Sequence, residues 1–272
     1  MAAAFDSIEQ PFILEETGEY LVVFKPAGMH SVPKGEAADG KDLVSWLALE
    51  QPNTRRAFET GSDGGWSSEL GMISRLDRGT SGIILFARTP ALRRELFALA
   101  SRGGIRKEYR LLASPSDRHL PGSMPGLKPL KLSCEAPQEA MAGYKDTAWM
   151  HIESFFRSYG EGGARVACID PGRAEECRRR LTKKTYTTFI RAEGKASGAP
   201  DGAVIASARI DAGFRHQIRA HLAWSGFPII GDRDYGGPDA RRLFLEAHRI
   251  TVDSAGSAEP VIFELYGTGH ES

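Results

Sequence analysis

Residues 73–86 have the sequence Ile73-Ser74-Arg75-Leu76-Asp77-Arg78-Gly79-Thr80-Ser81-Gly82-Ile83-Ile84-Leu85-Phe86. The part from Asp77 to Thr80 predicts a turn, because Asp hydrogen-bonds nearby backbone and Gly permits a positive φ. The part from Ile83 to Phe86 is continuously apolar, which is typical of a strand covered on both faces. The stretch therefore predicts a carboxylate fixed where a buried strand begins, between Arg75 and Arg78. An Asp that opens a turn usually has only a structural role, so this loop alone does not establish catalysis.

Four further blocks accompany this stretch along the chain. They are Lys25-Pro26-Ala27-Gly28, Lys107-Glu108-Tyr109, His216-Gln217-Ile218-Arg219-Ala220-His221-Leu222 and Gly231-Asp232-Arg233-Asp234-Tyr235-Gly236. Together with Arg75-Leu76-Asp77 and Thr80-Ser81-Gly82, and in this order, the blocks resemble the RluA-type pseudouridine synthases. Enzymes of that family isomerise selected uridines in RNA by detaching the base and rejoining it through carbon. The resemblance implies the same activity here, on structured RNA, with ribosomal RNA expected ahead of transfer RNA.

Composition is that of an ordinary globular protein of the cell interior. The 272 residues are 41% hydrophobic and 26% charged, enough for one large domain or two small ones. The three cysteines, Cys134, Cys168 and Cys177, form no paired framework, which favours a reducing compartment. The N-terminus has no signal-peptide pattern, and no apolar run is long enough to cross a bilayer. We therefore expect a cytoplasmic protein, without membrane association and monomeric.

The formal net charge is zero, with 35 basic and 35 acidic residues, although RNA-binding proteins usually carry a basic surface. The charge is unevenly distributed. Residues 88–110 hold seven basic and two acidic residues, and residues 173–184 hold six and two. Either cluster is equally well explained as a solvated helix face. Both together predict a local basic face for RNA.

The order of the expected elements indicates the α+β class, with one domain around a largely antiparallel sheet. The family resemblance implies the same: a single synthase-like domain with a mixed, mostly antiparallel sheet, flanking helices and a central cleft. Strands are expected at 20–24, 83–86, 105–113, 148–156, 164–169, 185–192, 204–211, 243–252 and 260–266. Helices are expected at 41–51, from Pro90 to the glycines at 103–104, and at 217–225, with a loop over 53–71. We expect residues 1–18 to be a lead without a separate RNA-binding domain, and residues 19–272 to form the catalytic domain with an insertion around 114–184.

The family resemblance also assigns site residues. Asp77 matches the catalytic carboxylate, which acts as nucleophile or as base; the sequence leaves both open. Arg219 matches its cationic partner, and Tyr109 matches the tyrosine that contacts the base and handles the proton lost from C5. The alternatives are a solvent-facing Arg219 and a Tyr109 that only packs in the core. Substrate binding is expected from Arg75, Arg78, Arg215, His216 and Gln217.

The chain departs from the family pattern at three positions. Ser74 and Glu246 stand where the family tends to have His, and Phe214 replaces an Arg. One alternative is therefore a catalytically inactive RNA-binding protein with the synthase fold. Another is a small-molecule glycosidase, which would need Asp232 or Asp234 as a second acid near Asp77. The isomerisation requires no cofactor, and the scattered histidines give no metal-ligand spacing.

Overall fold

The structure is a computed structural model that describes residues 8–33, 41–59, 69–117, 149–177, 181–196, 198–253 and 259–266. The chain divides into two compact units. The Asp77 unit comprises the described residues within 7–108 and 246–272, and the Arg219 unit comprises those within 109–245. Strand β4 (Ile105–Ala113) contributes residues 105–108 to the first unit and 109–113 to the second. The division falls within the segment that the sequence assigns to one catalytic domain.

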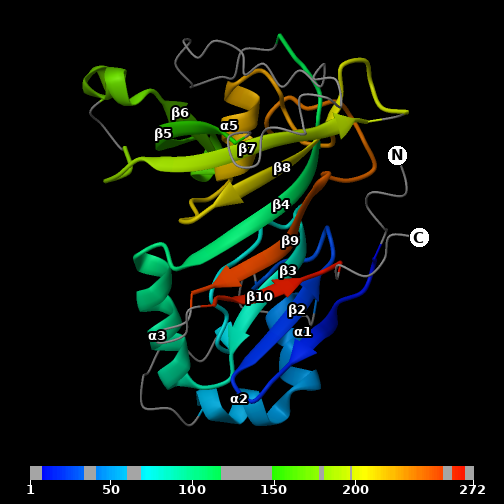
Figure 1. Ribbon diagram of the computed structural model, residues 1–272, viewed down its shortest axis with the longest axis vertical. Helices are drawn as coiled ribbons and strands as arrows, with labels where there is room; N and C mark the ends of the chain where they lie inside the picture. The colour runs from blue at the N-terminus through cyan, green and yellow to red at the C-terminus, as the bar shows by residue number, and fades with distance from the viewer. Residues whose placement is uncertain are drawn as a thin grey trace. The chain divides into compact units, whose positions relative to one another are not determined.

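The Asp77 unit is built on five strands (Figure 1). They are β1 (Phe12–Glu16), β2 (Tyr20–Lys25), β3 (Ser81–Ala87), β9 (Leu245–Val252) and β10 (Val261–Glu264). Their order is β1-β2-β3-β9, and β10 also pairs with β9. Pairing is antiparallel except between β3 and β9, which run parallel, so the predicted mixed, mostly antiparallel sheet is confirmed. Strand β1 was not predicted, and it lies within the expected N-terminal lead.

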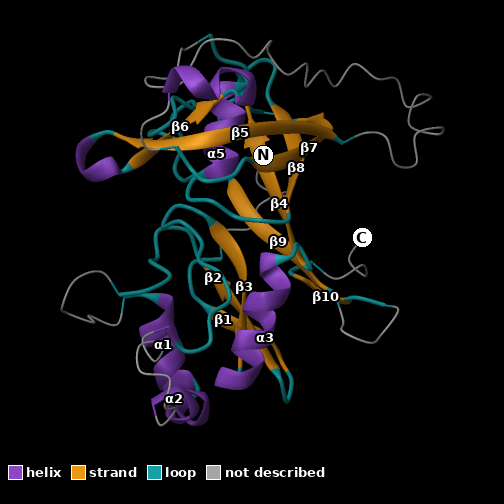
Figure 2. Cartoon of the chain, turned by 90° about the vertical axis from the view of Figure 1, so that its left-hand side faces the viewer, coloured by secondary structure: helices purple, strands orange, loops and turns teal. Residues whose placement is uncertain are grey.

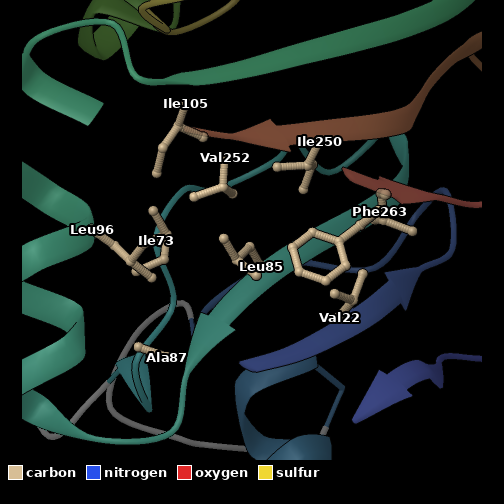
Figure 3. Packing of buried hydrophobic residues seen from close by; sticks show 10 residues of the cluster. Val22, Ile73, Leu85, Ala87, Leu96, Ile105, Ile250, Val252 and Phe263 are labelled. Atoms are coloured by element: carbon tan, nitrogen blue, oxygen red, sulfur yellow. The ribbon is translucent and has the colours of Figure 1, made fainter. Parts of the chain in front are cut away.

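Strand β3 is buried along its whole length, which confirms the prediction of a strand covered on both faces. Ile83, Leu85 and Ala87 share one core cluster with Leu96 of helix α3 (Pro90–Ser101) and Phe263 of β10. Figure 3 shows Leu85, Leu96 and Phe263 converging from the helix and the strands. The turn that carries Asp77 is therefore followed by a strand that is buried along its whole length.

Two predicted helices of this unit form, the first with slightly shorter bounds than expected. Helix α1 (Leu43–Glu50) is capped by Asp42, whose Oδ1 accepts a hydrogen bond from the backbone N–H of Ser45 at 2.9 Å. Helix α3 (Pro90–Ser101) is capped by Thr89 and closed by Gly103 at φ +81°. Figure 2 shows α1 and α3 on opposite sides of β2 and β3.

The predicted loop over 53–71 is wrong in its first part, where helix α2 (Pro52–Glu59) forms. Pro52 fits the first turn of a helix, where its missing N–H costs nothing. Phe58 is only 5% exposed, and Thr54 is also buried. Tertiary packing of this one face stabilises a helix that its polar composition did not suggest. Residues 60–68 of the predicted loop lie outside the described ranges.

The Arg219 unit contains the second half of β4 and four further strands, in the order β4-β8-β7-β5-β6. The four are β5 (Met150–Tyr159), β6 (Arg165–Ile169), β7 (Tyr186–Lys195) and β8 (Val204–Ile210). Both predicted strand pairs are confirmed, and a single 3-10 turn, η3 (Glu161–Gly163), joins β5 to β6. A second 3-10 segment, η4 (Pro171–Cys177), follows β6.

Helix α5 (Gln217–Trp224) confirms the last predicted helix and packs against β5, β6 and β7. Residues 217–223 are all buried. Of the expected insertion, residues 118–148 and 178–180 lie outside the described ranges, and the rest carries β5, β6 and η4. Among the helices of the described ranges, none is long and apolar enough to span a membrane.

Candidate active site

Asp77 is half-buried in the predicted turn, four residues before the first residue of β3. Its carbonyl oxygen accepts a hydrogen bond from the N–H of Thr80 at 3.1 Å, which closes the turn. Ser31 holds the preceding residue: its Oγ donates to the carbonyl of Leu76 at 2.8 Å and accepts from the N–H of Leu76 at 3.1 Å. The Asp77 carboxylate is thus presented by backbone fixed on both sides.

A second turn, the one after β2, is clamped against the Asp77 turn by Lys25. The Lys25 ammonium donates to the carbonyls of Pro26 and Met29, each at 2.9 Å, and to that of Arg78 at 3.4 Å. Gly28 adds two bonds, because its N–H donates to the Arg78 carbonyl at 2.8 Å and its own carbonyl accepts from Arg78 Nε at 2.9 Å. The side chain of Arg78 is therefore used, in part, to hold the two turns together.

Lys25 has no exposed surface, and this burial lowers its pKa from 10.5 to about 7. The negative charge of Asp77 opposes that fall. The three carbonyl acceptors also favour the ammonium form, since only that form has three N–H groups to donate. In the sequence, Lys25 belongs to a family block but carries no predicted role. The sequence feature that could have indicated its role is a lysine at the end of an apolar strand, immediately before a proline.

Arg75 is exposed, and it pairs with Glu69 through both Nε and Nη2. Glu69 also binds Arg93 of α3, whose Nη2 lies 3.1 Å from Oε2 and whose Nε donates to the carbonyl of Met72 at 3.3 Å. The segment that leads into the Asp77 turn is therefore attached to α3 by one carboxylate. Arg75 remains accessible on the outer side of that attachment.

In the Arg219 unit, Arg219 lies on α5 and is almost fully buried. Its Nε donates to Asp232 Oδ2 at 2.8 Å and its Nη2 to Asp232 Oδ1 at 2.7 Å, which is a bidentate pair. The same Nη2 donates to Asp234 Oδ2 at 2.8 Å. The guanidinium also stands 5.1 Å from the centre of the Tyr235 ring. The block at 231–236 thus fixes Arg219, which belongs to the block at 216–222.

The remaining predicted residues of this unit surround the start of α5. His216 has a positive φ of 57°, and its Nδ1 lies 3.0 Å from the Tyr235 hydroxyl. Gln217 is 2% exposed; its Oε1 accepts from the N–H of Phe214 at 2.9 Å, and its Nε2 donates to the carbonyl of Thr187 at 2.9 Å. Arg215 is exposed and donates to the carbonyl of Gly163. Gln217 is built into the scaffold, whereas Arg215 is accessible.

His221, at the other end of the same block, has no exposed surface. Its Nε2 lies 2.9 Å from Ser154 Oγ and its Nδ1 lies 2.8 Å from Thr188 Oγ1. Burial lowers the pKa of His221 to about 3. It is a neutral imidazole that joins α5 to β5 and β7.

The predicted site residues are therefore distributed over both units. Arg75, Asp77 and Arg78 lie in the Asp77 unit, together with Lys25, for which no role was predicted. The Arg219 unit holds Arg215, His216, Gln217 and Arg219, and it begins at Tyr109, which is 6% exposed on β4. The pairing of Asp77 with Arg219 stays a prediction.

Comparison with known proteins gives consistent results. A family model described as RNA pseudouridylate synthase matches residues 19–224. The chain is 25% identical over 258 residues to the dual-specificity RNA pseudouridine synthase RluA of Escherichia coli K12, covering 93% of this chain and 91% of that protein. It is 27% identical over 239 residues to an uncharacterized RNA pseudouridine synthase of Zymomonas mobilis, covering 86% and 84% of the two chains.

Solved structures show a similar fold. Human RNA pseudouridylate synthase domain containing 1 aligns with a TM-score of 0.60 at 18% identity, covering 95% of this chain and 84% of that one. Human RNA pseudouridylate synthase domain containing 4 aligns with a TM-score of 0.55 at 14% identity, covering 93% and 87%.

Proposed function

The chain belongs to the RNA pseudouridylate synthase family, and from this premise we propose that it isomerises specific uridines to pseudouridine in structured RNA, ribosomal RNA ahead of transfer RNA. The observation that carries the proposal is the rigid presentation of Asp77 on a turn clamped by Lys25 and braced by Ser31. A reacting carboxylate must be held in place, because small displacements from the productive geometry are costly in rate.

The reaction breaks the bond between N1 of uracil and C1′ of the ribose and forms a bond between C5 and C1′. The proton lost from C5 is balanced by one gained at N1. Asp77 stands beside C1′ or C2′ and acts as nucleophile or as base. Tyr109 contacts the flipped base and handles the C5 proton, and Arg219 stabilises the ionised carboxylate of Asp77.

RNA recognition falls to accessible basic side chains. Arg75 and Arg215 are exposed, so they can reach phosphates or an unstacked base without loss of core packing. Arg78 is exposed as well, although its Nε is committed to the clamp. His216 and Gln217 support the site by shaping the turn before α5. The protein acts in the cytoplasm, as a monomer and without a cofactor.

The alternative of a small-molecule glycosidase is disfavoured by the carboxylates it would need. Asp232 is fully buried, and both of its oxygens accept hydrogen bonds from Arg219. Asp234 is 55% exposed but is bound to the same guanidinium. Neither resembles an acid held ready to protonate a leaving group.

The test is a map of pseudouridine in total RNA from cells with and without the gene, together with assays of the purified protein on ribosomal and transfer RNA. We expect one or more pseudouridines to disappear without the gene and to return with wild-type protein but not with Asp77→Asn. Identical maps, with RNA bound by the purified protein but not modified, would favour the inactive RNA-binding alternative. Release of free base or sugar would favour the glycosidase.

A further inference from the structure

Glu246, the second residue of β9, is a carboxylate with no exposed surface. Its Oε2 accepts a hydrogen bond from Ser81 Oγ at 3.1 Å, and its Oε1 accepts one from the Tyr266 hydroxyl at 2.9 Å. Burial of a carboxylate is costly unless its oxygens are hydrogen-bonded, and here both oxygens are. Glu246 therefore joins two hydroxyls that lie far apart in the sequence.

Ser81 links this carboxylate to the catalytic turn. It is the first residue of β3 and follows Thr80, whose N–H closes the Asp77 turn. In the parallel pairing of β3 with β9, Ser81 stands opposite Glu246 and Gly82 opposite Ala247. A Cβ on Gly82 would lie 2.2 Å from the carbonyl oxygen of Ala247, so the two strands approach as closely as glycine allows. Glu246 thus holds β3 at the point where the turn joins it.

We infer that Glu246 is a positioning residue for Asp77, acting through Ser81, and that Tyr266 orients Glu246 from the segment after β10. The inference rests on the proposed function. Ser81 Oγ is fixed by Glu246 and the carbonyl of Asp77 is fixed by Thr80, so the two bonds bracket the turn from its C-terminal side. Ser31 and Lys25 hold the other side.

Steady-state kinetics of four variants test this role. We expect Glu246→Gln and Ser81→Ala each to lower kcat by about 10- to 100-fold, as small displacements of a reacting group do, with KM changed less than about twofold. The double variant should be no slower than the slower single variant, because both remove the same link. Tyr266→Phe should lower kcat less than either. The matched control is Glu264→Gln, which should give wild-type kinetics, since Glu264 of β10 pairs with Arg249 of β9.

The outcomes separate the inference from the proposed function. Wild-type kcat in both Glu246→Gln and Ser81→Ala, or additive losses in the double variant, overturns the positioning role alone. A wild-type protein that makes no pseudouridine overturns the proposed function and the inference with it. If thermal unfolding shows that Glu246→Gln does not fold, the kcat of Ser81→Ala tests the positioning role instead, because this variant keeps the Glu246 carboxylate. A fall in kcat at unchanged KM and unchanged melting temperature supports the role.

Discussion

Arg219 and Asp232 form a bidentate ion pair in which the carboxylate has no exposed surface. The two residues are 13 positions apart, one on α5 and one in the turn before Tyr235. Because the planar guanidinium is held by two parallel bonds, its orientation is fixed within the Arg219 unit itself. If Arg219 also interacts with Asp77, it does so with a guanidinium whose orientation Asp232 already fixes.

Arg219→Ala is expected to destabilise the protein by about 3 to 5 kcal/mol, because it leaves the Asp232 carboxylate buried without its partner. Arg219→Lys should recover only part of that loss, since an ammonium lacks the fork geometry. The measurement is the free energy of unfolding in urea. The control is Arg233→Ala, which breaks an exposed pair with Asp239 and should cost about 0 to 1 kcal/mol. Equal losses in the two alanine variants would contradict the buried-pair argument.

Asp77→Asn is expected to lower pseudouridine formation by at least about a hundredfold while the melting temperature stays within experimental error of wild type. The substitution keeps the size of the side chain and removes its charge. Asp253→Asn makes the same chemical change at a partly exposed pair with Arg106 and should retain activity. Product formed at the wild-type rate by folded Asp77→Asn protein would exclude Asp77 as the essential group.

The lowered pKa of Lys25 predicts a stability gain with pH. Between about pH 7, its pKa in the folded protein, and its ordinary value of 10.5, folded Lys25 loses its proton while unfolded Lys25 keeps it. The unfolded state then binds more protons, so stability rises with pH in this window, by at most about 1.4 kcal/mol per pH unit. Unfolding free energies at pH 7, 8 and 9 should show wild type gaining on Lys25→Met. The exposed Lys195→Met should show no such trend. Unfolding free energies of wild type and Lys25→Met that run parallel from pH 7 to 9 would refute the lowered pKa of Lys25.

His221 predicts the opposite trend in acid. Its folded pKa of about 3 lies below the ordinary value of 6.5, so below pH 6.5 only the unfolded state takes up the proton. Stability is therefore lost as the pH falls from 6.5 toward 3, by up to about 1.4 kcal/mol per pH unit. The stability advantage of wild type over His221→Gln should shrink between pH 6.5 and 4.5. The exposed His151→Gln serves as the control. An advantage that stays constant would show that His221 has the same pKa in the folded and unfolded states.

Salt dependence tests the predicted basic face. In the cluster at 88–110, Arg88 pairs with Glu16, Arg106 with Asp253, and Arg93 is buried against Glu69, so much of its charge is balanced internally. In the second cluster Lys183 and Lys184 are exposed. Replacing both lysines with Ala should reduce the log–log salt slope of RNA binding by about 0.7 to 0.9 for each phosphate that the protein no longer neutralises.

The double variant Arg88→Ala/Arg106→Ala is the matched control for salt dependence and should leave the slope nearly unchanged. Arg179 and Arg180, which we expect to contribute to the same face, lie outside the described ranges. A slope unaffected by the loss of both lysines would mean that the second cluster is only a solvated surface.

The sequence predicted what is encoded locally. The Asp77 turn, the buried strand after it and the Thr89 cap of α3 each follow from a few adjacent residues. Helix α2 was missed because its stabilising contact, the burial of Phe58, is tertiary. The partner of Arg219 and the pairing of Ser81 with Glu246 were missed for the same reason. No local pattern indicates which of many carboxylates meets an arginine 13 residues away or a serine 165 residues away.

The Asp77 unit is made from two pieces of chain, with most of the Arg219 unit encoded between them. On the ribosome, β1 to β3 emerge early. The parallel partner of β3 is β9, whose pairing residues Glu246 and Ala247 are synthesised much later. Until then the edge of β3 that receives β9 is unpaired, a state in which nascent chains recruit chaperones or associate with one another. The Asp77 turn and strand β3 therefore gain this partner only after β9 has been synthesised. The Asp77 turn is therefore finished when the end of the coding sequence is translated, and not when the part that encodes Asp77 is translated.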